Sequence, residues 1–261
     1  MVKHESTLRT LIVALLVCLV CSVFVAGAAV TLKPLQDKNR ELDEQRSILA
    51  IAGLGHADMS ADEVQEFYAR SIHVRLVDLR TGRFSADGEA VGFDHLAAAR
   101  DPAQSDALPA ERDIAAIGRR EHLSTVYLVE HDGSLDTLIL PVRGYGLWST
   151  LYGFIAVKSD LNTVVGFGFY QHGETPGLGG EVDNPKWTGL WSGKTLFDDD
   201  GQLAVEVIKG VVDPQSARAA HQVDGLAGAT LTSKGVNNLL HFWLGESGFG
   251  PFLANLKKGE A

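Results

Sequence analysis

The chain has 261 residues, of which 45% are hydrophobic and 21% are charged, and it contains 28 glycines but only 8 prolines. This composition is typical of a folded protein with many turns and excludes a largely disordered chain. The formal net charge is −10, and the lysines and arginines form no cluster. Because binding to a nucleic-acid backbone requires concentrated positive charge, we expect no nucleic-acid partner.

The first predicted element is a transmembrane helix. No charged residue occurs from Thr10 to Leu32, and a helix of that length measures roughly 34 Å, enough to cross a hydrocarbon core of about 30 Å. We therefore predict an N-terminal tail at 1–10 and a membrane span at 11–32. The alternative is a cleaved secretory signal ending at Ala26-Gly27-Ala28, although the apolar run exceeds the usual signal core of about 7–15 residues. Positive residues lie on both sides of the span, so their count leaves its orientation undecided.

Both cysteines, Cys18 and Cys21, lie inside this span. Their C-x-x-C spacing is compatible with a redox or metal pair that takes further ligands from a partner protein. A packing surface is the simpler interpretation. The region after the span contains no cysteine and therefore no disulfide.

Residues 33–58 are predicted to form a charged helical linker, and residues 59–261 to form one domain. Leucines recur in the linker at heptad spacing, at Leu35, Leu42 and Leu49. The domain begins with a predicted helix over 60–70, which Ser60 opens and which has acidic residues in its first turn.

Alternation of apolar and polar residues then predicts strands separated by turn residues. The predicted strands are 72–79, 124–130, 137–142, 152–158 and 164–170, and short helical segments are predicted at 94–100 and 109–117. Because most strands follow one another without intervening helices, the pattern indicates an α+β fold dominated by antiparallel hairpins. Residues 198–201, Asp-Asp-Asp-Gly, are interpreted as a hairpin turn, since Lys209 stands where a calcium-binding loop requires Glu.

Common catalytic and nucleotide-binding motifs are absent from the sequence. The nearest approach to a dinucleotide-binding G-x-G-x-x-G, at Gly166 and Gly168, lacks the third glycine, and no Walker loop, G-x-S-x-G or H-E-x-x-H segment occurs. The 9 histidines are scattered singly, which predicts no metal site. The sequence therefore predicts no complete active site on this chain alone.

The most informative stretch is 224–233, Asp-Gly-Leu-Ala-Gly-Ala-Thr-Leu-Thr-Ser. It places the Thr230 hydroxyl among small residues, just before a predicted helix whose N-cap is Thr232 or Ser233. That helix is indicated by a periodic apolar run: Val236, Leu239, Leu240, Trp243 and Leu244. A helix N-terminus presents free backbone N–H groups and the positive end of the helix dipole, which suits a phosphate. From the residues alone, an ordinary turn closed by Asp224 before a capped helix explains the same pattern.

This stretch resembles the Asp-x-x-(Ser/Thr/Ala)-Gly-Ala-Thr-x-(Ser/Thr) segment of the flavin-bearing subunits of membrane redox pumps. Together with 174–181, the aromatic-rich tail 242–253 and the N-terminal span, it extends the resemblance over the whole chain to the NqrC family, the C subunits of the Na+-translocating NADH:quinone oxidoreductase. The resemblance implies that Thr230 carries FMN through a phosphoester bond formed by a separate flavin transferase. It also implies cofactor-binding roles for Asp224, Gly228, Ala229 and Thr232. One departure is Ala227, where the family commonly has Ser, a residue that is also short.

The glycine-rich segment 174–180 is the second predicted flavin contact. Glycine has no Cβ, so the backbone at Gly177 and Gly179 can approach a flat ligand, and Leu178 is placed to lie against its ring. Glu174 or Thr175 would bond the polar edge of the ring. From the residues alone, an ordinary glycine-rich surface loop is the alternative, and the resemblance carries the flavin-facing roles. Three weaker candidates suit the core or a partner protein equally well: Tyr145, Leu147 and Trp148.

The resemblance implies a single-pass protein of the bacterial inner membrane, with residues 1–10 in the cytoplasm and an FMN-binding domain in the periplasm. The implied function is electron transfer from NADH toward quinone through covalent FMN, as one subunit of an ion-pumping enzyme and with its other subunits as partners. The alternatives are the G subunit of the related Rnf complex and a non-redox, membrane-anchored interaction module. The aromatic-rich tail favours the first family over the Rnf protein.

Overall fold

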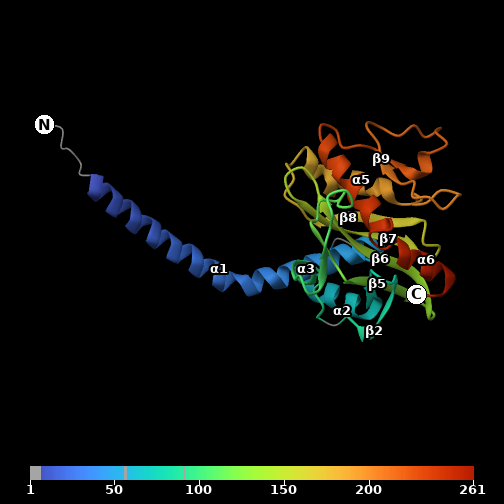
Figure 1. The fold of residues 1–261 in the computed structure, drawn as a ribbon, viewed down its shortest axis with the longest axis horizontal. Coiled ribbons are helices and arrows are strands. Elements are labelled where there is room, and N and C mark those ends of the chain that lie inside the picture. The colour runs from blue at the N-terminus through green and yellow to red at the C-terminus, as the bar shows by residue number, and fades with distance from the viewer. Residues whose placement is uncertain (1–6, 56–57, 91) are drawn as a thin grey trace. The chain divides into compact units, whose positions relative to one another are not determined.

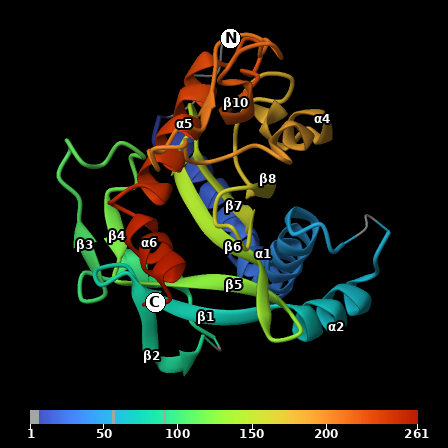
Figure 2. The same cartoon turned by 90° about the vertical axis from the view of Figure 1, so that its right-hand side faces the viewer.

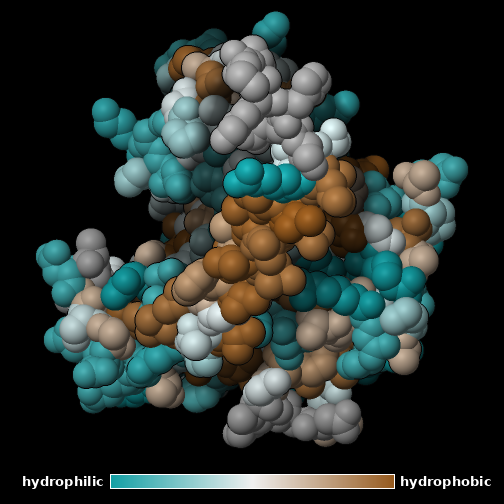
Figure 3. All heavy atoms as spheres, turned by 90° about the vertical axis from the view of Figure 1, so that its left-hand side faces the viewer, coloured by the Kyte–Doolittle hydropathy of each residue, from teal (hydrophilic) through white to brown (hydrophobic). Residues whose placement is uncertain are grey.

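The structure is a computed structural model that describes residues 7–55, 58–90 and 92–261. Its contacts divide the chain into two compact units, residues 1–43 and 44–261. Helix α1, Thr7–Ile51, provides the described part of the first unit and continues into the second (Figure 1). By length and composition, α1 qualifies as a membrane span, and its apolar side chains form the brown band of Figure 3.

Helix α1 covers both the predicted span and the predicted linker without a break as far as Ile51. The leucines at heptad spacing do not share one environment, because Leu35 is exposed whereas Leu49 is buried within the second unit. The heptad spacing therefore does not mark one continuous buried stripe.

An antiparallel sheet of six strands forms the centre of the second unit, in the order β2-β1-β5-β6-β7-β8 (Figure 2). The strands are β1 His73–Asp78, β2 Arg83–Glu89, β5 Leu123–His131, β6 Ser134–Tyr145, β7 Thr150–Lys158 and β8 Val164–Gln171. All five predicted strands lie in this sheet. Strand β2 was not predicted, because its sequence is mostly polar and lacks the alternation that signals a half-buried strand.

Shorter elements surround the sheet. They are α2 Ala61–Ser71, α3 His95–Arg100, β3 Ser105–Ala107, β4 Arg119–Glu121, η1 Gly179–Asp183, α4 Pro185–Thr188, η2 Gly189–Trp191, β9 Glu206–Val207, η3 Ala219–His221, β10 Gln222–Val223, α5 Thr230–Leu244 and α6 Gly250–Lys258. As predicted, Ser60 caps α2, where it forms a reciprocal capping box with Glu63. The predicted hairpin turn at 198–201 is confirmed by the bridge between Phe197 and Leu203.

The predicted helical segment 109–117 is wrong, because these residues form turns. The Asp113 carboxylate accepts hydrogen bonds from the backbone N–H groups of Ile117 at 2.8 Å and Gly118 at 2.7 Å. This local side-chain bonding satisfies the backbone in a non-helical conformation and so competes with a helix.

The two faces of the sheet pack against different helices. On β5, Val126 and Leu128 belong to the core that includes α5, whereas the hydroxyl of Tyr127 between them donates to Glu44 of α1 at 3.2 Å. Successive side chains of a strand point to opposite faces, so α5 and residue 44 of α1 lie on opposite sides.

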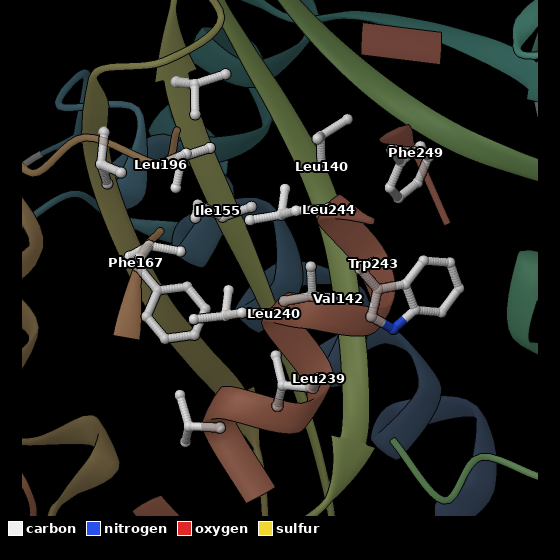
Figure 4. Close-up of a cluster of buried hydrophobic side chains, with 14 of the residues drawn as sticks. Leu140, Val142, Ile155, Phe167, Leu196, Leu239, Leu240, Trp243, Leu244 and Phe249 are labelled. Carbon is white, nitrogen blue, oxygen red and sulfur yellow. The ribbon is translucent and has the colours of Figure 1, made fainter. Parts of the chain in front are cut away.

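The apolar run predicted for the last long helix is the core face of α5 (Figure 4). Leu239, Leu240, Trp243 and Leu244 of α5 are at most 1% exposed, and they pack with side chains of β6, β7 and β8. The indole N–H of Trp243 donates to the Arg143 carbonyl of β6 at 2.7 Å. This packing holds the N-terminal end of α5 beside the loops that follow β6 and β8.

Candidate functional site

Helix α5 begins at Thr230, earlier than predicted. Ala229 is its N-cap residue and makes no side-chain capping bond, so the prediction of Thr232 or Ser233 as N-cap is wrong. Both residues are buried inside the first turns, where their hydroxyls serve tertiary contacts. Thr232 donates to Glu174 at 2.7 Å, and Ser233 accepts from the Leu226 N–H at 3.1 Å.

The N-terminus of α5 is consequently open around an exposed Thr230. Within the described ranges, no protein group accepts a hydrogen bond from the backbone N–H of Thr230, Leu231 or Thr232. The preceding turn needs Gly228, whose φ of 73° lies in the left-handed region that favours glycine. Among the described residues, the site therefore combines an unbonded hydroxyl with unbonded N–H donors at the positive end of a helix.

Asp224 ties the turn before α5 to a neighbouring loop. Its carboxylate accepts from the Val212 N–H at 2.8 Å, and its carbonyl accepts from the indole N–H of Trp187 at 2.9 Å. The next residue, Gly225, donates its N–H to the Gly210 carbonyl at 2.8 Å. Asp224 thus orders the turn before α5, which is one of the roles open to it from the sequence.

A pocket of about 190 Å³ lies beside Thr230, between α5 and residues 207–210. Asn237 of α5 fixes the 207–210 side of the pocket. Its side-chain oxygen accepts from the Val207 N–H at 2.6 Å, and its side-chain NH2 donates to the Val207 carbonyl at 2.7 Å. Lys209 and Lys234 line this pocket and are exposed. The pocket therefore offers positive charge next to the hydroxyl.

Glu174 lies on the other side of α5 and is only 5% exposed. Its Oε1 accepts from the backbone N–H groups of Leu147 at 3.0 Å, Trp148 at 2.9 Å and Ser149 at 3.2 Å, and its Oε2 accepts from Thr232. Burial raises the pKa of a carboxyl group, but these hydrogen bonds outweigh burial and hold the pKa of Glu174 below its ordinary value. Glu174 is thus an ionised group whose bonds are to the protein, whereas the adjacent Thr175 is exposed.

The two predicted flavin-binding segments lie side by side. A Cβ built on Gly228 would come 3.1 Å from Cδ2 of Leu178, so the tip of the 174–180 loop touches the turn before Thr230. Several large apolar side chains near this junction are exposed: Tyr145 46%, Leu147 38%, Trp148 66%, Leu178 46% and Leu231 57%. Leu231 belongs to this group because it lies on the same face of α5 as Gly235, one turn earlier. Gly235 packs against the Tyr145 carbonyl, so this face of α5 is turned toward residues 145–148.

Sequence reasoning missed Leu231, Lys209 and Lys234. Leu231 carried a local signal, since a large apolar residue lay off the core face of the predicted helix. Lys234 also carried a local signal, since it follows Thr230 by four residues on the predicted helix. Lys209 carried none, because it comes from a loop that reaches α5 only in the folded chain.

Residues 146–245 match the family model described as FMN-binding domain, and this range contains both predicted flavin-binding segments. A Pseudomonas aeruginosa protein, named as the C subunit of Na(+)-translocating NADH-quinone reductase, is 72% identical over 261 residues, which is 100% of both chains. The chain belongs to the family of C subunits of the Na(+)-translocating NADH-quinone reductase. A relative of the same name from Yersinia pestis is 51% identical over 258 residues and covers 98% of this chain and 96% of its own.

Solved structures agree with this membership. The crystal structure of Shewanella oneidensis NqrC superposes with a TM-score of 0.76 at 38% identity and covers 85% of this chain and 99% of that one. The crystal structure of the C subunit from Parabacteroides distasonis superposes with a TM-score of 0.63 at 31% identity. It covers 85% of this chain and 96% of that one. The membership confirms the predicted α+β fold and a role in a Na+-translocating NADH-quinone reductase with an FMN-binding domain, and it decides against the Rnf protein and the non-redox module.

Proposed function

We propose that this protein relays electrons in the Na+-translocating NADH:quinone oxidoreductase through FMN attached to Thr230 by a phosphoester bond. The observation that carries the proposal is the exposed Thr230 hydroxyl at the open N-terminus of α5. When bound, FMN supplies the redox chemistry, and the protein supplies attachment, orientation and electrostatics.

The surroundings of Thr230 suit a phosphodiester. Unbonded N–H groups at a helix N-terminus and the helix dipole contribute typically about 0.3–1 kcal/mol toward a nearby anion. Lys209 and Lys234 add positive charge in the adjoining pocket. In the described part of the chain, neither lysine forms an ion pair that would neutralise it.

The exposed apolar side chains beside the attachment turn suit a flat ring system. Leu178 touches the turn itself, and Trp148 and Leu231 flank it at 66% and 57% exposure. Apolar and aromatic side chains are the usual lining of cofactor sites. We propose that the isoalloxazine ring covers part of this surface, with Thr175 and the Gly177–Gly179 backbone at its edge.

Attachment needs a second protein, because a threonine hydroxyl is a weak nucleophile at neutral pH. A flavin transferase would bind FAD and a metal ion that polarises the diphosphate. The bond from Thr230 Oγ1 to the flavin-side phosphorus forms, the phosphoanhydride bond breaks, AMP leaves, and the hydroxyl proton passes to a base of the transferase. The exposed Ala227 and Gly228 leave the hydroxyl accessible to that enzyme.

We further propose a single-pass topology in the bacterial inner membrane, with 1–10 cytoplasmic, the span at 11–32 and the FMN-binding domain periplasmic. The supporting observation is that the apolar part of α1 is exposed along its length. The other subunits of the complex and the membrane are then the partners.

The test is Thr230→Val, which keeps the side-chain shape and deletes the hydroxyl. Protein purified from a host with the transferase should lack the mass of FMN less one water and should show no flavin fluorescence on a denaturing gel. Thr81→Val, at an exposed threonine of the β1–β2 turn, is the control and should keep both signals. Covalent flavin retained by Thr230→Val would refute the assignment.

A further inference from the structure

Glu174 joins three segments that are far apart in the chain. It follows β8, its Oε1 receives three consecutive N–H groups from the β6–β7 connection, and its Oε2 receives the hydroxyl of Thr232 in α5. A second bond links the same two loops, since the Gly173 N–H donates to Ser149 Oγ at 2.6 Å. The bond from Thr232 connects these joined loops to the first turn of α5, two residues from Thr230.

Two glycines, Gly146 and Gly179, lie on either side of this carboxylate and leave room for it. A Cβ on Gly179 would lie 2.5 Å from Thr232 Oγ1 and 2.6 Å from Glu174 Oε2, and a Cβ on Gly146 would lie 2.7 Å from Glu174 Oε1. Contacts this short do not occur in real structures, so any side chain at either position would displace the carboxylate or its donor. The arrangement is therefore tightly built and leaves little freedom to the first turn of α5.

The hydrogen-bonding capacity of Glu174 is used within the protein. A carboxylate offers about four lone-pair sites, and Glu174 receives three N–H groups and one hydroxyl. In the described ranges its carboxylate has no Lys, Arg or His partner, so backbone dipoles and Thr232 compensate its charge. Because all four bonds are to the protein, this carboxylate orders the loops around it.

We infer that Glu174 is the positioning residue of the attachment site: through Thr232 it holds the first turn of α5, and so Thr230, in the geometry that accepts the flavin phosphate. This inference rests on the proposed function and gives Glu174 and Thr232 a role different from contact with the flavin. Transfer to Thr230 requires its hydroxyl in line with the bond that breaks, and a misplacement of about 1 Å costs roughly 100-fold in rate.

The first test is a time course of FMN attachment by the purified transferase with FAD and Mg2+, followed by intact mass, on unflavinylated full-length protein in detergent. Thr232→Val deletes the donor to Glu174 and should slow attachment roughly 10- to 100-fold, whereas Thr232→Ser should restore it to near the wild-type rate. The matched control is Thr125→Val, which removes another buried, hydrogen-bonded hydroxyl on the far side of the domain. Thr125→Val should lower the melting temperature about as much as Thr232→Val does, and it should leave the attachment rate unchanged.

The second test varies Glu174. Glu174→Gln keeps an oxygen for the three N–H groups and an amide that can donate to Thr232, so it should attach FMN at close to the wild-type rate; Glu174→Ala should be as slow as Thr232→Val. If Glu174→Ala does not fold, the attachment rate of Thr232→Val tests the inference in its place. Wild-type attachment by Thr232→Val, or equal slowing by Thr125→Val, overturns the inference. Absence of FMN from Thr230 in the wild type would instead overturn the proposed function.

Discussion

At the scale of single residues, the candidate site depends on a few polar groups whose partners come from distant segments. Thr230 is exposed and unbonded, whereas Asp224, Glu174 and Thr232 are each committed to tertiary contacts. Among the described residues, Thr230, the proposed attachment residue, is thus without a hydrogen-bond partner, and its neighbours bond to other parts of the protein.

Asp224→Ala should reduce FMN attachment much more than stability. The substitution frees the Val212 N–H and loosens the turn before Thr230, but loss of one turn contact costs only about 1 kcal/mol. The covalently flavinylated fraction from intact mass, together with the melting temperature, measures the two effects. Asp213→Ala is the control, because that exposed carboxylate accepts a local bond, from the Gln215 N–H at 2.9 Å, in place of the longer-range bond that Asp224 accepts. A fully flavinylated Asp224→Ala protein would show that Asp224 has only a local structural role.

At the scale of elements, a buried ion pair joins β4 to β6 close to α5. Arg143 of β6 bonds Glu121 of β4 at 2.5 Å, and both side chains are almost fully buried. The guanidinium also lies 4.9 Å from the ring centre of Trp243 in α5. Burial raises the pKa of a carboxyl group, but Arg143 outweighs it and holds the pKa of Glu121 below its ordinary value.

Glu121→Gln should destabilise the domain by about 3 kcal/mol at pH 7, because it leaves Arg143 buried without a counter-charge. The folded-state pKa of Glu121 is lowered, so its contribution is full above the ordinary value of 4.5 and is lost as the pH falls through the lowered pKa. Urea unfolding of both proteins from pH 7 down to pH 3 should show the difference shrink in this range. Glu130→Gln, at an exposed site on β5, should change stability by less than about 0.5 kcal/mol. A difference that does not depend on pH would contradict the ion-pair explanation.

At the scale of the whole molecule, the apolar span and the flavin-binding domain are separable in sequence but share one helix. The second compact unit begins at Glu44, and Ile48 and Leu49 of α1 are each 1% exposed within it. The end of α1 therefore belongs to the domain core.

Deletion of residues 1–32, with export by a foreign signal, should give a soluble domain that still accepts FMN. Full-length protein should remain in the membrane through carbonate washing, since about 20 apolar residues insert far more firmly than any charge contact. Deletion of residues 1–51 should instead lower the melting temperature sharply, because it removes Ile48 and Leu49 from the core. Fractionation and thermal unfolding measure these outcomes. Native protein that begins near Ala29 and stays in the soluble fraction would refute the membrane anchor.

Local patterns in the sequence were sufficient for the long apolar N-terminal helix, for five strands of the sheet and for the core face of α5. Each of these depends on periodicity or on neighbouring residues, so it can be read without knowing what packs against it. The start of α5 and segment 109–117 were predicted wrongly because side-chain hydroxyls and a carboxylate served contacts that a propensity argument does not weigh. The hydrogen bonds around Glu174 and the position of Lys209 beside Thr230 depend on the tertiary structure alone, since they form only when β6, β8, the 207–210 loop and α5 meet. A buried charge needs donors from several directions at once, and a folded chain can supply these from segments that are remote in sequence.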